Sequence, residues 1–198
     1  MRKAVGVGET AGGQVIVEVL GPKDAKRLSG EVCAAYRTSF GAPPNNEGAA
    51  EFEHQRASYA DLLERRGFLL SVARLDGLLV GFAYGAFLRQ GGQWWNGMRD
   101  PLPAGFTDES GSRTWQLVDL GVLPGHRKRG IAKQLTEAAL AGCGAQRAAL
   151  AVEPRLEGNQ RLYRSWGWRR IGSVDAPPSS INDVYDIYLL EDLPTGRP

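Results

Sequence analysis

Three cations and a glycine precede a segment with helical periodicity near the middle of the chain. The apolar run at 117–123 ends at a Pro-Gly break, and after it come Arg127, Lys128, Arg129 and Gly130. A helix N-terminus carries backbone N–H groups without intrahelical partners and a partial positive charge, so phosphate groups bind there. Because Gly130 has no Cβ, the backbone can approach a ligand closely. The segment therefore predicts a phosphate-binding loop.

A second polar feature lies nearer the carboxyl end. Asn159 and Tyr163 are four residues apart, and within a helix this spacing puts both side chains on one face. Packing beside Trp166 in the core would explain Tyr163 without any chemistry.

Strands and helices that position these residues follow from the hydrophobic pattern and the breakers. We expect strands at 15–20, 68–74, 78–88, 114–123, 147–152, 168–174 and 184–190, and helices at 23–39, 47–66, 129–143 and 157–166. Asp76-Gly77 predicts a hairpin turn between the second and third strands. The basic loop then joins a strand to a helix, and the Asn159–Tyr163 pair lies on the last helix.

The length of 198 residues predicts one domain with short extensions. A hydrophobic content of 42% and a charged content of 23% are ordinary for a globular protein. We expect a flexible N-terminal tail at 1–14, a single domain at 15–191 and a C-terminal tail at 192–198.

Charge and cysteine content exclude several classes of partner. The formal net charge of +2 is too small to attract nucleic acid in bulk, and no apolar run approaches the ~20 residues of a membrane span. Cys33 and Cys143 with the two histidines give no metal-ligand spacing, and no signal peptide is recognisable. We expect a cytoplasmic protein, monomer or homodimer, without a metal and without nucleic-acid or membrane partners.

The basic loop resembles the acetyl-CoA signature of the GCN5-related N-acetyltransferases (GNAT), which reads Arg/Gln-x-x-Gly-x-Gly/Ala. Here the six residues run from Arg127 to Ala132, between a strand and an amphipathic helix. The order of elements from about Val15 to Leu190 also resembles this fold. The resemblance implies an α/β (α+β) protein: a mixed, mostly antiparallel sheet of about six to seven strands, helices on both faces, and splayed central strands.

By this resemblance acetyl-CoA is the acyl donor and no metal takes part. The pyrophosphate would be bound by the loop residues Arg127, Lys128, Arg129, Gly130, Ile131 and Ala132. The pantetheine amides would pair with the exposed edge of the preceding strand, at Leu120, Gly121, Val122 and Leu123. Asn159 would contact the cofactor arm. Tyr163 would protonate the leaving thiolate, which needs little help because a thiol has a pKa of ~8.5.

The attacking amine must be neutral, and the sequence leaves its base open. Deprotonating an amine of pKa ~10.4 at pH 7 costs roughly 4–5 kcal/mol, which a general base would reduce. Asp119, on the strand before the loop, is the first candidate; the alternative is a structural carboxylate satisfied by loop amides. Glu53, His54 and Glu153 are further candidates. Direct transfer without a dedicated base is also compatible with the sequence.

A long segment at 90–113 carries two adjacent tryptophans. Loops of this length in compact domains are often functional, and Trp94 and Trp95 could hold a cationic or aromatic acceptor. We therefore predict Trp94, Trp95 and Glu53 as acceptor-binding residues. The alternative is that one tryptophan packs beneath the loop and the other caps it.

These features predict an acetyl-CoA-dependent N-acetyltransferase. It would act by direct attack of an amine of a small molecule or peptide, without an acyl-enzyme, because Cys143 should lie far from the thioester. The alternative is a catalytically silent acyl-CoA-binding or regulatory module of the same fold.

Overall fold

The computed structural model describes residues 3–10, 13–176 and 182–193, and the chain forms two compact units. The described part of the first unit comprises residues up to 86 and residues 117–144, and the second comprises residues 87–116 and 145–193. The strand β5 (Thr114–Val122) is shared, since its residues 114–116 belong to the second unit.

Four antiparallel strands and four helices build the first unit. The strands are β1 (Lys3–Thr10), β2 (Gly13–Leu20), β3 (Leu69–Leu75) and β4 (Leu78–Phe87), which ends one residue into the second unit. The helices are α1 (Pro22–Arg27), α2 (Ser29–Phe40), α3 (Ala49–Leu63) and α4 (Ile131–Cys143), with a short 3-10 turn η1 (Pro124–His126) after β5.

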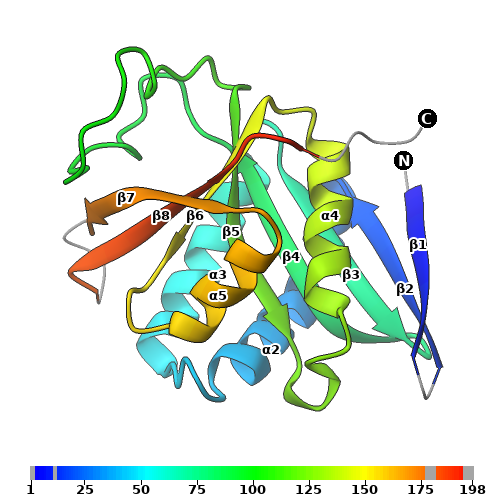
Figure 1. The fold of residues 1–198 in the computed structure, drawn as a ribbon. Helices are drawn as coiled ribbons and strands as arrows, with labels where there is room; N and C mark the ends of the chain where they lie inside the picture. Colours follow the sequence, from blue (N-terminus) through cyan, green and yellow to red (C-terminus); the bar gives the residue numbers. More distant parts are fainter. Residues whose placement is uncertain (1–2, 11–12, 177–181, 194–198) are drawn as a thin grey trace. The chain divides into compact units, whose positions relative to one another are not determined.

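Alternating side chains of β3 and β4 explain why helices cover both faces of this unit. Leu70 and Phe82 point into a core formed with α1, α2 and α3. On the opposite face the Ser71 hydroxyl donates to the Leu135 carbonyl of α4 at 2.8 Å. Figure 1 shows α4 in front of β3, with α2 and α3 behind the strands. The period of two along each strand therefore positions α4 and the loop before it.

One expected helix is divided in two. We predicted a continuous helix at 23–39, but the backbone leaves helical geometry at Leu28, with φ −95° and ψ 4°. The Ser29 hydroxyl donates to the Lys26 carbonyl at 2.8 Å, which satisfies an end of α1. A side chain that bonds its own backbone competes with the helix, and the apolar spacing alone does not reveal this.

The second unit is built on β6 (Arg147–Val152), β7 (Arg169–Asp175), β8 (Val184–Leu190) and α5 (Glu157–Ser165). The parallel pairing of β5 with β6 runs from Thr114 opposite Arg147 to Gln116 opposite Ala149. β8 pairs antiparallel with both β6 and β7. Buried side chains of residues 88–113 pack on β6, β7 and β8, with Leu88 and Trp95 among them.

The hydrogen-bonded strand order is β1-β2-β3-β4-β5-β6-β8-β7, which makes a mixed sheet. The strands β2 to β8 correspond to the expected ones. β1 is additional, because we predicted a flexible tail at 1–14 and the chain instead pairs Lys3–Thr10 with β2. Glycines and the lack of alternation hid this strand. The predicted tail at 192–198 lies mostly outside the described residues, as do residues 177–181.

Candidate active site

The basic loop enters α4 through left-handed backbone. Lys128 has φ +63° and Gly130, the N-cap of α4, has φ +75°. A Cβ built on Gly130 would meet one atom within 4 Å, Nε2 of Gln134 at 3.9 Å, so the space beside this residue is open. The Gln134 N–H donates to the Gly130 carbonyl at 3.2 Å, and the N–H groups before it in the first turn have no acceptor within the helix. This geometry suits an anion.

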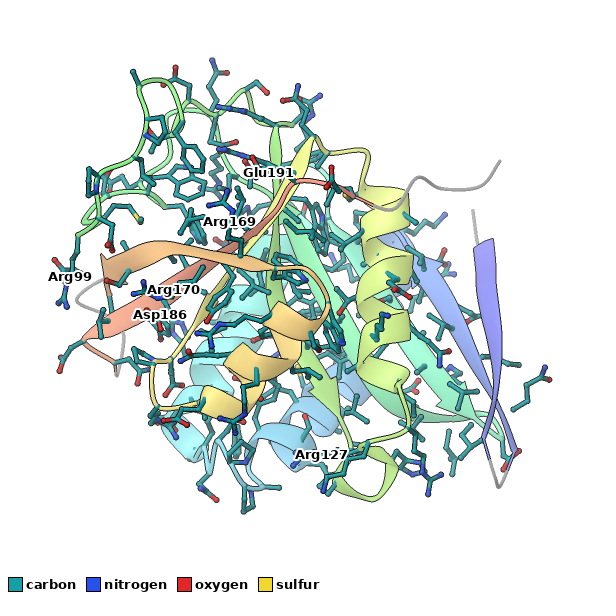
Figure 2. The ribbon with its side chains drawn as sticks, in the orientation of Figure 1. Arg99, Arg127, Arg169, Arg170, Asp186 and Glu191 are labelled. Carbon is teal, nitrogen blue, oxygen red and sulfur yellow. The ribbon has the colours of Figure 1, made fainter. Side chains whose placement is uncertain are left out.

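The Arg127 side chain holds the loop in place. Its Nε donates to the Val122 carbonyl at 3.1 Å, its Nη2 to the Ser39 carbonyl at 2.7 Å, and its Nη1 to the Pro43 carbonyl. Arg127, labelled in Figure 2, thus ties β5 to the C-terminal end of α2. We expected its charge to face phosphate; the exposed charges of the loop are instead Lys128 and Arg129.

The end of β5 is shaped by close packing. A Cβ on Gly121 would lie 2.6 Å from the Phe82 ring and 2.7 Å from the Ser39 hydroxyl, so only glycine fits there. The Leu123 N–H donates to the Val80 carbonyl at 2.9 Å. Among the predicted pantetheine partners, the Val122 carbonyl and the Leu123 N–H thus already have partners in the protein. Cofactor contacts by Leu120, Gly121, Val122 and Leu123 stay predictions.

Asp119 joins a buried chain of hydrogen bonds inside the first unit. The Tyr84 hydroxyl on β4 donates to Oδ2 of Asp119, and Nε2 of Gln55 on α3 donates to the Tyr84 hydroxyl at 3.0 Å. Tyr84 is fully buried and Gln55 is 4% exposed, whereas Asp119 is partly buried. The carboxylate is therefore satisfied by a phenol, where our structural alternative had supposed loop amides.

The surroundings of Asp119 bring its titration close to neutral pH. Burial raises the pKa of Asp119 to about 7, a rise opposed by the Tyr84 hydrogen bond and assisted by the negative charge of Glu47. The Tyr36 hydroxyl donates to Oε2 of Glu47 at 2.7 Å. Burial and the Asp119 charge raise the pKa of Tyr36 and of Tyr84 well above the ordinary value, so both phenols stay protonated. Asp119 can accept a proton near pH 7, which suits a general base.

The other candidate bases pair with residues that do not belong to this chain of hydrogen bonds. Glu53 is exposed on α3 and pairs with Arg56 at 2.7 Å, and exposed His54 lies 3.3 Å from the Ser58 hydroxyl. In the second unit, Glu153 pairs with Arg155 at 2.6 Å. Because successive helix residues turn by about 100°, the inward residue of this α3 turn is Gln55, which the sequence did not single out.

The predicted pair on α5 shares one helix face, as its spacing implied. The adjacent face anchors the helix, since Arg164 donates to Gln160 at 3.2 Å and to the Tyr188 hydroxyl of β8 at 3.0 Å. Asn159 and Tyr163 are both partly buried. The Tyr163 ring also packs edge-on against Trp166 at 5.7 Å and Trp168 at 6.1 Å, so the packing interpretation has support and its chemical role stays a prediction.

The two tryptophans have different environments. Trp95 is 6% exposed, and its indole N–H donates to Oε1 of Glu109 at 3.1 Å. The Arg147 guanidinium lies 5.4 Å from the Trp95 ring centre. Trp94 is partly buried and packs edge-on against Trp95 at 4.5 Å. These contacts support the packing alternative for Trp95, whose indole helps to hold residues 87–113, and the acceptor roles of Trp94 and Trp95 stay predictions.

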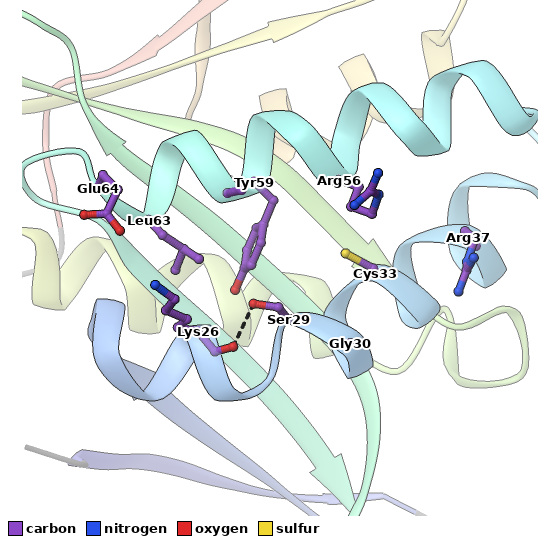
Figure 3. Close-up of a pocket in the computed structure, with 10 residues that line it drawn as sticks. Lys26, Ser29, Gly30, Cys33, Arg37, Arg56, Tyr59, Leu63 and Glu64 are labelled. Carbon is purple, nitrogen blue, oxygen red and sulfur yellow. Dashed lines mark hydrogen bonds between the residues drawn. The ribbon is translucent and has the colours of Figure 1, made fainter.

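A cavity of about 480 Å³ lies in the first unit beside α2 and α3. Figure 3 shows Cys33 and Arg37 on α2 and Arg56 and Tyr59 on α3 around it. Arg37 on α2 and Arg56 on α3 line the cavity. The residues just before them, Tyr36 and Gln55, belong to the surroundings of Asp119, so each helix presents one face to the cavity and another to Asp119. The cavity contains none of the predicted site residues.

Among the described residues, no helix combines the length and apolar character needed to cross a membrane. The same residues contain no group of three or more His, Cys, Asp or Glu side chains arranged to hold a metal ion. The cytoplasmic location, the oligomeric state and the lack of a nucleic-acid partner stay predictions.

Comparisons with known proteins agree with the fold. The model of the acetyltransferase (GNAT) family matches residues 31–168. No curated protein sequence matches the chain. The ribosomal-protein-S18-alanine N-acetyltransferase from Escherichia coli is similar with a TM-score of 0.60 and 13% identity, over 92% of this chain and 96% of that one.

Two further similar structures were solved with ligands. Arabidopsis thaliana Naa50, in complex with the bisubstrate analogue CoA-Ac-MVNAL, has a TM-score of 0.57 and 16% identity over 87% of this chain and 97% of its own. The PaiA N-acetyltransferase from Thermoplasma acidophilum, in complex with coenzyme A, has a TM-score of 0.55 and 14% identity over 89% and 99%. At these identities the similarity shows the fold.

Proposed function

Because this chain belongs to the GNAT acetyltransferase family, we propose that it transfers an acetyl group from acetyl-CoA directly to an amine of a small molecule or peptide. The observation that carries the proposal is the left-handed turn at Lys128 and Gly130 in front of α4. Acetyl-CoA supplies an activated thioester and a pyrophosphate. The open space at Gly130 and the first-turn N–H groups of α4 suit the pyrophosphate.

Charge near this turn favours the same ligand. Lys128 and Arg129 are exposed beside the turn, while Arg127 fixes its backbone to Ser39. The similar structures that contain coenzyme A or a CoA analogue support this donor. In the proposal Asn159 contacts the cofactor arm, on the strength of the family resemblance.

Asp119 is the proposed general base. Its carboxylate takes a proton from the ammonium form of the acceptor, directly or through a water, and leaves a neutral amine able to attack the acetyl carbon. A base with a pKa of about 7 is half ionised at neutral pH, where its proton transfer is most effective. Tyr163 holds a proton at its phenol oxygen for the departing thiolate, again on the strength of the family resemblance.

The acceptor is an amine in this proposal. The names of two similar proteins, an alanine N-acetyltransferase acting on a ribosomal protein and a complex with a peptide-bearing CoA analogue, support an amine acceptor. We retain Trp94 as an acceptor contact because it is partly exposed. Glu53 is not retained, because its carboxylate pairs with Arg56.

A panel of amines incubated with acetyl-CoA tests the function, with CoA release as the readout and calorimetry for binding. We expect at least one amine to be acetylated. Gly130→Ala should weaken acetyl-CoA binding about tenfold, because a left-handed conformation costs an L-residue roughly 1–2 kcal/mol and the added methyl enters the open space.

The matched control for this variant is Gly125→Ala. A Cβ on Gly125 meets nothing within 4 Å, so binding should change less than about twofold. Tight acetyl-CoA binding without turnover of any amine would contradict the enzyme and support the silent binding module. Equal binding by Gly130→Ala and the wild type would remove the turn from the site.

A further inference from the structure

The hydrogen bonds around Asp119 have a direction that follows from the donors available. An ionised carboxylate only accepts, so the single proton of the Tyr84 hydroxyl points to Asp119. The Tyr84 oxygen then has only lone pairs to offer on its other side. There it accepts from the Gln55 amide, whose Nε2 lies 3.0 Å away. The chain therefore runs from Gln55 through Tyr84 to Asp119.

A turned amide would reverse this direction. With its carbonyl oxygen toward Tyr84, Gln55 would compete with Asp119 for the same phenol proton. The observed donation by Nε2 leaves Asp119 as the acceptor of that proton. Because Gln55 is 4% exposed on α3 and Tyr84 is fully buried, water cannot easily replace either partner.

We propose that Gln55 is a positioning residue for the general base: its amide keeps the Tyr84 hydroxyl donating its hydrogen bond to Asp119 and so stabilises the carboxylate over the carboxylic acid. This inference rests on the proposed function, in which Asp119 is the base. Gln55 touches neither donor nor acceptor in this role; it acts through Tyr84.

The hydrogen bond from Tyr84 decides the protonation state of Asp119, because the other groups that face this carboxyl favour its neutral form. Burial favours the neutral acid, and the Glu47 charge, from the segment between α2 and α3, does the same. The Tyr36 hydroxyl on α2, whose pKa the Asp119 charge helps to raise, donates a hydrogen bond to Glu47. Of the named influences on Asp119, the Tyr84 hydrogen bond alone lowers its pKa. Weakening that bond should leave Asp119 protonated at neutral pH.

Two variants at one position test the inference in a graded way. Gln55→Leu keeps a similar volume and removes the N–H donor. Gln55→Glu places a carboxylate there that competes for the Tyr84 proton and adds negative charge. We expect the titration midpoint of Asp119 to rise by roughly 0.5–1 pH unit in Gln55→Leu and by more in Gln55→Glu.

Two readouts follow the midpoint. The first is carbon-13 NMR of labelled aspartate across the pH range, with the Asp119 signal assigned by its loss in Asp119→Asn. The second is the pH profile of kcat/KM for the best amine, in which activity lost at pH 7 should return at higher pH. Arg56→Gln is the matched control, since Arg56 is the next residue along α3 and faces the cavity of Figure 3; its midpoint should equal that of the wild type.

An unchanged NMR midpoint in both Gln55 variants overturns the inference, whatever the turnover. Activity reduced equally at every pH, with the midpoint unchanged, shows a purely structural role and overturns it as well. A raised NMR midpoint without turnover of any amine by the wild type upholds the directed chain while contradicting the proposed function. If Gln55→Leu does not fold, Gln55→Glu and Tyr84→Phe must both raise the midpoint for the inference to stand.

Discussion

Glu109 in the second unit and Asp119 in the first are both held among polar partners, and the partners of the two carboxyl groups differ. Oε1 of Glu109, in the second unit, accepts from Arg147 at 3.1 Å and from the Thr114 hydroxyl at 2.7 Å. Asp119, in the first unit, accepts from the Tyr84 phenol. A cation beside a buried carboxylate fixes its charge, whereas a phenol leaves the carboxyl free to gain and lose a proton. The first arrangement serves structure and the second suits catalysis.

The Glu109 cluster holds the long segment before β5. Arg147 on β6 also donates to the Phe106 carbonyl, and its guanidinium lies 4.3 Å from the Phe106 ring centre. Burial lowers the pKa of Arg147, while its bond to Glu109 raises it. One buried cation thereby joins β6, β5 and residues 106–109, and its loss should be costly.

Arg147→Met is expected to give the largest effect on stability. It leaves the Glu109 side chain, 3% exposed, without its cation, and such a buried unpaired charge costs about 3–5 kcal/mol. Urea unfolding measures this loss. The control is Arg169→Met, which breaks the exposed pair with Glu191 seen in Figure 2 and should cost less than about 1 kcal/mol. Equal losses in the two variants would contradict the structural role of the Glu109 cluster.

Asp119→Asn should lose activity and keep its stability, whereas Arg147→Met loses stability. The amide oxygen can still accept a hydrogen bond from Tyr84, so the fold is kept, but the proposed proton acceptor for the amine is gone. We expect turnover to fall about a hundredfold or more, with the free energy of unfolding at pH 8 unchanged or increased. Steady-state kinetics and urea unfolding on the same preparation decide this. A variant that is destabilised as strongly as Arg147→Met would make Asp119 structural too.

The contrast between these clusters also marks what the sequence can reveal. The loop at Lys128 and Gly130 was predictable because its motif, its strand and its helix are contiguous. Gln55 and Tyr84 were not, because Gln55 lies 29 residues before Tyr84 in sequence, and Tyr84 lies 35 before Asp119. Only the tertiary fold brings them together, and a glutamine in a polar helix gives no signal of burial.

In the second unit, too, the sequence reveals residues but not their tertiary partners. Two adjacent tryptophans in a long loop are evident from the sequence, and their placement favoured an acceptor role. The partner that gives Trp95 a structural role, Glu109, lies 14 residues further on. Most strands and helices, by contrast, were predictable to within about two residues, since their periodicity is local.

The pH dependence of stability sharpens the comparison further. The pKa of Asp119 rises from its ordinary 3.8 to about 7 on folding, so between these values the folded state binds more protons. The stabilisation of the folded state by protonated Asp119 is fully present below pH ~4 and is lost as the pH rises through 7. From pH 5 to pH 8 the wild type should lose roughly 2.5 kcal/mol relative to Asp119→Asn.

Subtracting the two unfolding curves at each pH isolates Asp119, because every other titrating group is common to both proteins. The unfolding free energy of the wild type minus that of Asp119→Asn should decrease steadily from pH 5 to pH 8. A constant offset between the two proteins leaves this slope unchanged. A flat difference across pH 5–8 would mean that Asp119 is ionised throughout, as a carboxylate beside a cation would be.

Trp94 provides the smallest expected effect and the test of whether the second unit contributes to acceptor binding. Trp94 is partly exposed beside the buried Trp95. If it stacks on a cationic acceptor, Trp94→Ala should raise the acceptor KM about two- to fivefold, since an exposed cation–π contact contributes roughly 0.5–1 kcal/mol. Its kcat should change little, because the residue holds no proton.

Trp95→Phe is the matched control for that measurement. It removes the indole N–H that donates to Glu109 and should lower stability by about 1 kcal/mol without altering the acceptor KM. If both variants raise KM together, residues 87–113 respond as one body and Trp94 has no specific contact. If neither variant raises the acceptor KM, the acceptor is bound without these tryptophans. The Glu109 cluster and its neighbours would then serve structure alone, and the proposed chemistry would depend on the residues around Asp119.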